Sequence, residues 1–233
     1  MFLLGTVVNS LLIIVGTLIG KFLNRIPEKM KDTVMQAIGL AVMVLGLQMG
    51  LKSENFLVVI LSLVFGAMLG ERLKLEDRLN QVGILLENKI GSNHQGSISQ
   101  GFVTATLIFV IGAMGVIGAL DSGIRGDHSV LYTKSIIDGF TALILTTTLG
   151  IGVIFSAIPV FIYQGLIALF ATQIDKWIPQ AWMDSFILEM TATGGLMIFA
   201  IGLNLMGLTK IRVANLLPGI FVTALVVSFY YFF

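Results

Sequence analysis

The sequence predicts an all-α membrane protein, a polytopic bundle of about eight transmembrane helices, and three observations lead to this fold class. Of its 233 residues, 56% are hydrophobic and only 12% are charged, whereas soluble domains carry about 25% charged residues. The mean hydropathy is +0.97, so hydrocarbon must be the solvent for most of the surface. Apolar stretches of about 20 residues, the length that spans a bilayer, recur along the whole chain.

The predicted spans lie, in chain order, at residues 2–20, 31–50, 54–71, 99–120, 130–152, 155–174, 183–206 and 213–233. No Lys or Arg precedes the first span and no small-residue cleavage site follows it before Lys21, so it is expected to be a retained helix. The fifth and sixth spans are divided at Gly150–Gly152, because about 45 residues are too many for one crossing. Pro159 then falls in the first turns of the sixth helix, where proline is tolerated.

Residues 72–90 form the longest predicted inner linker, and apolar residues recur in it at helical spacing. They are Leu75, Leu79, Val82, Leu86 and Ile90. Charged residues stand between them, which favours an amphipathic helix lying on the inner surface of the membrane. A cytosolic extension of the third span is the alternative.

The distribution of Lys and Arg predicts the orientation, because cytoplasmic loops carry an excess of both. With the N-terminus outside, the inner loops hold ten of them: Lys21, Arg25, Lys29, Lys31, Arg72, Lys74, Arg78, Lys89, Lys210 and Arg212. The outer loops hold four: Lys52, Arg125, Lys134 and Lys176. Both termini are therefore predicted outside, in a bacterial cytoplasmic (inner) membrane.

A faint internal repeat crosses the chain. Gly39–Leu40 and Gly46–Leu47–Gln48 recur as Gly195–Leu196 and Gly202–Leu203–Asn204, and Ile26–Pro27 matches Ile178–Pro179. The match pairs residues 1–71 with 155–233 around central helices at 99–152, all within one transmembrane domain of residues 1–233. Because the paired spans would run in opposite directions, this would be an inverted repeat of the kind common in transporters. Chance similarity between Gly- and Leu-rich helices is the alternative.

Two acids inside predicted spans are the first candidate site residues, since an ionisable group there costs about 3 kcal/mol on insertion scales. Asp138 lies two turns into the fifth span, and Glu189 lies at a similar depth in the seventh. With Asn9 and Thr193 they would form a polar pocket of oxygen ligands for a cation or proton. The alternatives are an Asp138 paired with Lys134 one turn away, and a Glu189 that reaches the interface.

Other polar and small residues have open interpretations. Asp121, Asp127 and His128 in the outer loop would suit a cation, although a solvated turn is the simpler reading. Gly112, Gly115 and Gly118 in the fourth span indicate either close helix packing or a broken helix that lines a cavity; packing is the commoner case. Gln48, Gln164 and Asn204 are expected to make helix-to-helix hydrogen bonds only.

Several classes of function are excluded or disfavoured. The chain has no cysteine, so disulfides and thiolate sites are excluded. Its two histidines, His94 and His128, fall in predicted loops, and no hydrolase or metalloprotease motif is present, so we expect no enzyme and no cofactor; a metal ligand set is not identified. The net charge of +1 indicates no nucleic-acid partner. Glycine faces would suit a homo-oligomer and packing within one chain equally well.

The chain resembles a bacterial integral-membrane family of unknown function, the YdfK/YqgA-like proteins. The likeness is carried by Ala105-Thr106-Leu107, Phe109, Gly112, Met114, Gly126-Asp127, Lys134-Ser135, Asp138-Gly139, Gly150-Ile151-Gly152-Val153, Ser156-Ala157, Gly5-Thr6-Val7-Val8-Asn9 and the stretch 66–71. The resemblance implies a multi-pass protein and carries over no binding residues. Two functions follow as expectations: a transporter or channel for a small solute or ion, coupled to a cation or proton, or a non-transporting scaffold, lipid-binding or regulatory membrane protein.

The orientation can be tested directly, because the chain has no cysteine of its own. Ser129→Cys, at the end of the outer loop, should react with a membrane-impermeant maleimide in intact cells. Asp77→Cys, in the inner linker, should react only after permeabilisation. Labelling of both positions from the same side would contradict the predicted topology.

Overall fold

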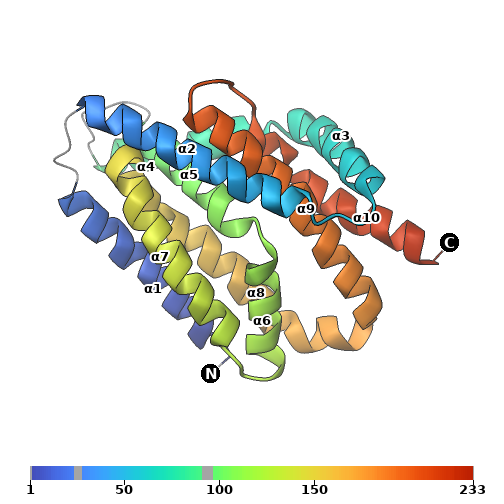
Figure 1. Ribbon diagram of the computed structural model, residues 1–233. Coiled ribbons are helices and arrows are strands. Elements are labelled where there is room, and N and C mark those ends of the chain that lie inside the picture. The colour runs from blue at the N-terminus through green and yellow to red at the C-terminus, as the bar shows by residue number, and fades with distance from the viewer. Residues whose placement is uncertain (1, 24–27, 91–96, 233) are drawn as a thin grey trace. The chain divides into compact units, whose positions relative to one another are not determined.

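The computed structural model describes residues 2–23, 28–90 and 97–232, and every regular element in these ranges is a helix (Figure 1). The elements are α1 (Leu4–Phe22), α2 (Glu28–Gly50), α3 (Phe56–Leu73), α4 (Leu75–Ile90), α5 (Ser97–Val110), α6 (Ala113–Ile124), α7 (Ser129–Leu149), the 3₁₀ helix η1 (Ile151–Ser156), α8 (Ala157–Trp177), α9 (Gln180–Leu205), the 3₁₀ helix η2 (Val213–Leu216) and α10 (Pro218–Phe232). The predicted all-α class is confirmed. The Ile26–Pro27 part of the repeat and His94 lie outside the described residues.

The helices form two compact units. Unit 1 contains residues 1–34, 79–110 and 114–177, so that α1, α5 to α8 and most of α4 belong to it. Unit 2 contains residues 35–78, 111–113 and 178–233, with α3, α9, α10 and most of α2. The expected repeat halves are each divided between the units, and the single transmembrane domain expected from the sequence stays a prediction.

Six helices of the described chain are long and apolar enough to cross a membrane: α1, residues 32–50 of α2, α3, η1 with α8, α9, and η2 with α10. The bent pair of α5 and α6 would make a seventh. The remaining predicted span, the fifth, corresponds to α7, which has 21 residues but carries Lys134 and Asp138 and is not among these candidates. Several crossings are therefore supported, and the count of eight is not confirmed.

The expected continuous fourth span is broken. It forms α5 and α6, which meet at an angle of 63°. Gly112 has a φ of +143° at the break, a conformation that a side chain with a Cβ rarely adopts. The packing interpretation favoured by the sequence was wrong at this position, although Gly118 packs closely on Leu131 of α7. Residues 111–113 belong to unit 2, where Ile111 meets Gly194 of α9.

Two other breaks separate neighbouring helices. Gly150, with a φ of +79°, ends α7 and starts η1, so the predicted division between the fifth and sixth spans is confirmed. Lys74, with a φ of 51°, ends α3, so that α4 is a separate helix rather than a straight continuation of the third span. The placement of α4 at the membrane surface stays a prediction.

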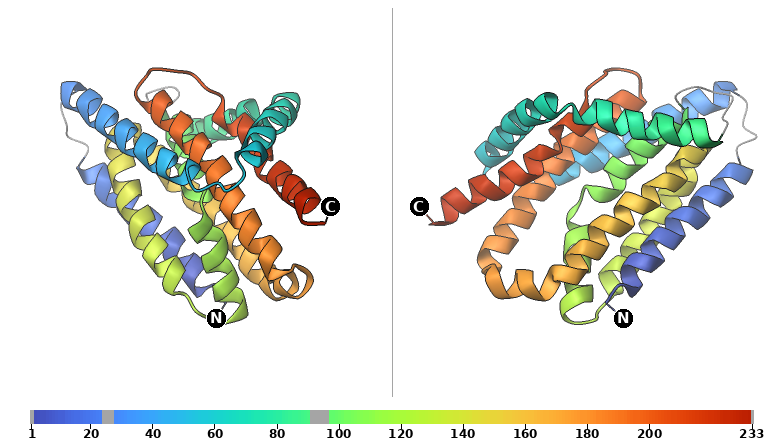
Figure 2. Two further views of the ribbon diagram at one scale, coloured as in Figure 1. Left: turned by 45° about the vertical axis from the view of Figure 1, so that its right-hand side comes forward. Right: turned by 180° about the vertical axis from the view of Figure 1, so that it is seen from behind.

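Glycine brings α1 and α7 together in unit 1. A Cβ at Gly16 would collide with the carbonyl oxygen of Gly139, and one at Gly20 with that of Leu143. Gly5 lies against Leu131, so residue numbers increase together and the two helices run parallel, side by side in Figures 1 and 2. Parallel spans need an odd number of crossings between them; α2, α3 and the bent pair would supply three.

Helices α2 and α9 cross in unit 2 (Figure 2), and their glycine contacts have a reciprocal pattern. Gly39 lies against Gly202, and Gly46 lies against Gly195. The sequence repeat pairs Gly39 with Gly195 and Gly46 with Gly202. Each of the two α2 glycines therefore contacts the α9 glycine that the repeat pairs with the other α2 glycine. Such exchange of partners is the signature of a two-fold contact between equivalent elements.

The distribution of polarity is the reverse of that of a soluble protein. Large apolar side chains face outward, among them Phe22, Phe221 and Leu225, each more than 70% exposed. Polar side chains such as Thr6, Asn9 and Gln164 are fully buried. A bilayer explains both facts, because hydrocarbon solvates the apolar surface and polar groups must find partners inside the protein.

The α1–α7 contact predicts that a substitution at Gly16 lowers stability more than a substitution at a glycine outside the contact. Gly16→Val should lower the melting temperature of the detergent-solubilised protein by several degrees, because its side chain must push the backbone of α7 away. Gly165→Ala in α8 is the matched control, since a Cβ there meets only the end of the Leu3 side chain at 3.7 Å. Equal melting temperatures for Gly16→Val and the control would show that the two backbones do not touch.

Candidate functional site

A buried ion pair lies on α7. The Nζ atom of Lys134 is 2.9 Å from Oδ1 and 2.7 Å from Oδ2 of Asp138, one helical turn away. Lys134 is 7% exposed and Asp138 is 5% exposed. The alternative in which Asp138 pairs with Lys134 therefore describes the local geometry, but the pair is enclosed by unit 1 instead of standing at a helix end.

Two amide side chains extend this pair into a network across three helices. The side chain of Asn9 on α1 lies beside the Asp138 carboxylate and interacts with it. Its Nδ2 atom donates to Oε1 of Gln164 on α8, at 3.2 Å. Because a carboxylate only accepts, the contact with Asp138 fixes the amide orientation of Asn9, and Asn9 in turn fixes that of Gln164.

Some polar atoms in and beside this network have no hydrogen-bond partner among the described residues. Asn9 Oδ1 and Gln164 Nε2 have no hydrogen-bond partner in the described structure, and neither has Thr6 Oγ1, one turn before Asn9. An ideal Cβ on Gly115, in the first turn of α6, would lie 3.5 Å from Lys134 Cε and 3.7 Å from Gln164 Nε2. The unpartnered amide therefore lies beside the helix that follows the Gly112 break. An unsatisfied buried polar group costs about 1–3 kcal/mol, so the hydrogen bonding of this cluster is incomplete at an energetic cost.

Glu189 has a separate set of partners in unit 2. Its carboxylate accepts hydrogen bonds from Ser53 Oγ at 2.6 Å and from the backbone N–H groups of Glu54 and Asn55, both at 3.0 Å. These groups directly precede α3, so Glu189 stabilises the positive end of that helix. The residue is only 4% exposed, although its partners belong to the α2–α3 connection expected at the interface.

The remaining candidates lie apart from the ion pair in sequence and in their contacts. Thr193, fully buried on α9, has its hydroxyl 3.3 Å from that of Thr223 on α10. Asp121 on α6 pairs with Arg125 at 3.7 Å. Asp127 accepts a hydrogen bond from the Ser129 N–H, which lowers the pKa of its carboxyl. The contacts of Asp121 and Asp127 are thus those expected of a solvated turn, the simpler of the two interpretations.

The sequence-predicted residues thus divide into two sets. Asp138 and Asn9 come together in unit 1, while Glu189 and Thr193 are one turn apart on α9 in unit 2. A pocket shared by Asp138 and Glu189 stays a prediction. Within the described ranges, no three His, Asp or Glu side chains are grouped as metal ligands.

A second polar junction, between the start of α4 and η2, was not anticipated. At the start of α4, the Glu76 N–H donates to Asn215 Oδ1 at 2.7 Å, and the Ala214 N–H donates to Glu76 Oε2 at 2.9 Å. Partial burial raises the pKa of the Glu76 carboxyl. The junction holds the α3–α4 turn against η2.

Comparison with known proteins gives the family. Residues 4–228 match the family described as "Protein of unknown function (DUF554)". The chain belongs to this family. It is 32% identical to the uncharacterized membrane protein YdfK of Bacillus subtilis (strain 168), over 96% of this chain and 95% of YdfK. It is 30% identical to the uncharacterized protein YqgA of Escherichia coli (strain K12), over 93% of each. No solved structure matches the chain.

Membership in the DUF554 family confirms the resemblance noted from the sequence and supports a membrane protein. It also shows that a bacterial relative of nearly the same length covers both units. The family description assigns no activity, so any functional argument depends on the chemistry of the buried residues.

The ion pair predicts a specific pattern of stability. Lys134→Met leaves the Asp138 carboxylate buried without its cation and should destabilise the protein by about 3–5 kcal/mol. Lys134→Met combined with Asp138→Leu removes both charges and should cost clearly less. Unfolding of the three proteins in mixed micelles measures the difference. If the double variant is as unstable as the single one, the two side chains contribute through their volume and not through their charges.

Proposed function

We propose that this DUF554 protein is a small membrane transporter or channel for an ion or small solute, with a cation or proton bound at Asp138. Asn9 would supply a neutral oxygen beside the carboxylate. The observation that carries the proposal is the buried network of Lys134, Asp138, Asn9 and Gln164. Intramembrane ionisable residues are rare, and most mark pathways of ions or protons.

The incomplete hydrogen bonding of the network supports a ligand rather than a purely structural role. Asn9 Oδ1 is an unused acceptor on the side chain that interacts with Asp138, and carboxylate and amide oxygens are the atoms that hard cations prefer. Lys134 now supplies the positive charge at this carboxylate. A cation or proton arriving there would take the place of that charge.

Two features of the backbone also favour transport. The break between α5 and α6 frees backbone groups inside a predicted span, which membrane proteins tolerate only where the backbone is buried in protein or lines a cavity. The reciprocal α2–α9 contact is the geometry expected of two equivalent helices in an inverted repeat, an arrangement common in secondary transporters. The repeat itself is part of the proposal, with halves 1–71 and 155–233.

The proposed location is the bacterial cytoplasmic membrane, with both termini outside. The bias of ten inner against four outer Lys and Arg residues supports this orientation. No catalytic step is part of the proposal.

A second candidate is a non-transporting scaffold or lipid-binding protein, and one observation favours it. Both intramembrane acids have protein partners: Asp138 is paired with Lys134 and Glu189 accepts three hydrogen bonds. A dry and structural interior would have such pairings. The two candidates differ in whether Asp138 can exchange its cation.

Transport in proteoliposomes separates the candidates. Asp138→Asn keeps the side-chain shape but removes the charge, so uptake driven by a sodium or proton gradient should fall by at least about tenfold, the effect of losing 1.4 kcal/mol of binding. Size-exclusion chromatography must first show that the variant is folded, because Asp138→Asn leaves Lys134 buried without its carboxylate.

Asp121→Asn is the matched control, because it removes a partly exposed carboxylate paired only with Arg125. It should transport like the unsubstituted protein. If the unsubstituted protein shows no gradient-driven uptake with any small cation tested, the result would favour the scaffold function. Normal transport by Asp138→Asn would rule out the assigned site.

A further inference from the structure

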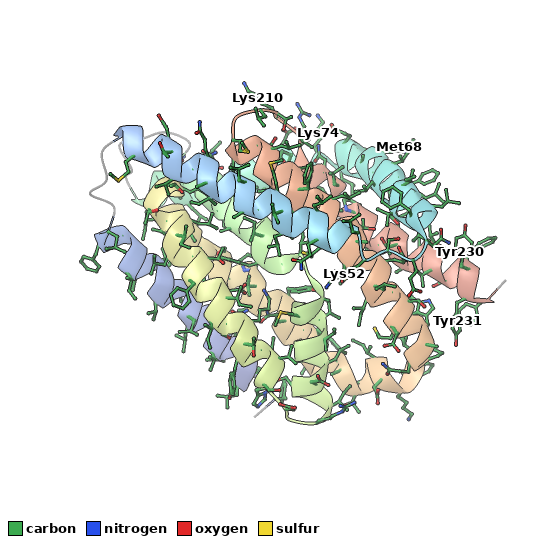
Figure 3. All side chains as sticks on the ribbon, viewed as in Figure 1. Lys52, Met68, Lys74, Lys210, Tyr230 and Tyr231 are labelled. Atoms are coloured by element: carbon green, nitrogen blue, oxygen red, sulfur yellow. The ribbon has the colours of Figure 1, made fainter. Side chains whose placement is uncertain are left out.

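Unit 2 contains a pocket that the proposed transport site does not use. It has a volume of about 190 Å³ and lies where α3 begins and α9 and α10 pass. Two carboxylates line it, Glu54 and Glu189, together with the rings of Tyr230 and Tyr231. Figure 3 shows both tyrosines at the end of α10.

The two carboxylates differ in how far they are already engaged. Glu189 accepts three hydrogen bonds from the start of α3. Glu54 is exposed, and in the described chain no Lys, Arg or His lies within ion-pair distance of it. No basic residue lines the pocket. Its charge is therefore negative, and one carboxylate is free to meet a cation.

The rest of the lining selects the kind of cation. Val58 and Leu188 give the pocket apolar surface, whereas a metal ion prefers a close shell of oxygens. Tyr230 and Tyr231 are half-exposed, so their rings can be reached from solvent. Aromatic faces with a carboxylate bind organic ammonium groups through cation–π and ionic attraction together.

We propose that this pocket binds the ammonium group of a small organic cation, with Glu54 as its counter-ion and the two tyrosine rings against its methyl or methylene groups. The ammonium could belong to a free amine in solution or to a lipid headgroup such as ethanolamine or choline. The chemistry of recognition is the same for both sources. The inference does not depend on transport through Asp138.

The chain provides a reporter next to the pocket. Trp182 stacks on Phe186 and donates to Ser228 Oγ at 3.1 Å, and the adjacent Ser185 and Val227 line the pocket. The only other tryptophan is Trp177, which is 81% exposed. In a Trp177→Phe background, fluorescence of Trp182 should therefore respond to an occupant.

The test titrates this purified full-length protein with choline and with ethanolamine, and compares nanodiscs of phosphatidylethanolamine with nanodiscs of phosphatidylglycerol. Saturable change with the free amines identifies a solute site; change only with phosphatidylethanolamine identifies a lipid-headgroup site. Either result supports the proposal. Glu54→Gln and Tyr230→Leu should each weaken the interaction by about tenfold.

Asp184→Asn is the matched control, because Asp184 lies next to Ser185 in α9 but does not line the pocket. Its affinity should stay within about twofold of the unsubstituted protein. The proposal is overturned by a response to neither amine nor lipid, by an equal response to neutral ethylene glycol, or by an equal loss in Asp184→Asn and Glu54→Gln. Glu54 is exposed and only its backbone N–H contacts Glu189, so Glu54→Gln should fold.

Discussion

The structure depends on one constraint: polar groups in hydrocarbon must find their partners inside the protein. Unit 1 meets it by enclosing an ion pair of α7 with amides from α1 and α8. Each member restricts the next, because the carboxylate orients Asn9 and Asn9 orients Gln164. Asn9 Oδ1 and Gln164 Nε2 in this network are left unpartnered, so the constraint is almost, but not fully, satisfied by protein alone.

The close contact of α1 and α7 makes this network feasible. Asn has a short side chain, and it can reach the neighbourhood of Asp138 only if the two backbones nearly touch. Gly16 and Gly20 allow that approach. The glycines and the charged residues, which look like separate features in the sequence, therefore serve one arrangement: small residues bring the helices together so that a polar residue on one helix can serve a charged residue on the other.

Much of the fold could be predicted because bilayer thickness sets helix length. The division at Gly150 followed from a stretch too long for one span, and the pairing of Lys134 with Asp138 was one of two alternatives because both lie on one helix face. The partners of Glu189 could not be predicted, since Ser53, Glu54 and Asn55 are about 135 residues away in the chain. The break at Gly112 was one of two interpretations and not the favoured one, because GxxGxxG spacing suits a packed helix as well as a broken one. Nothing local distinguished Gln164 from other polar residues in spans.

The hydrogen bonds between Glu189 and the start of α3 have a mechanical consequence. One side chain of α9 holds a hydroxyl and two consecutive amides of the short connector that leaves α2. Three hydrogen bonds from the residues before α3 converge on this carboxylate of α9. A shift of α9 along its axis would therefore pull on the start of α3. The two helices are thus coupled at this end, and a displacement of one relative to the other would have to stretch or break these three bonds.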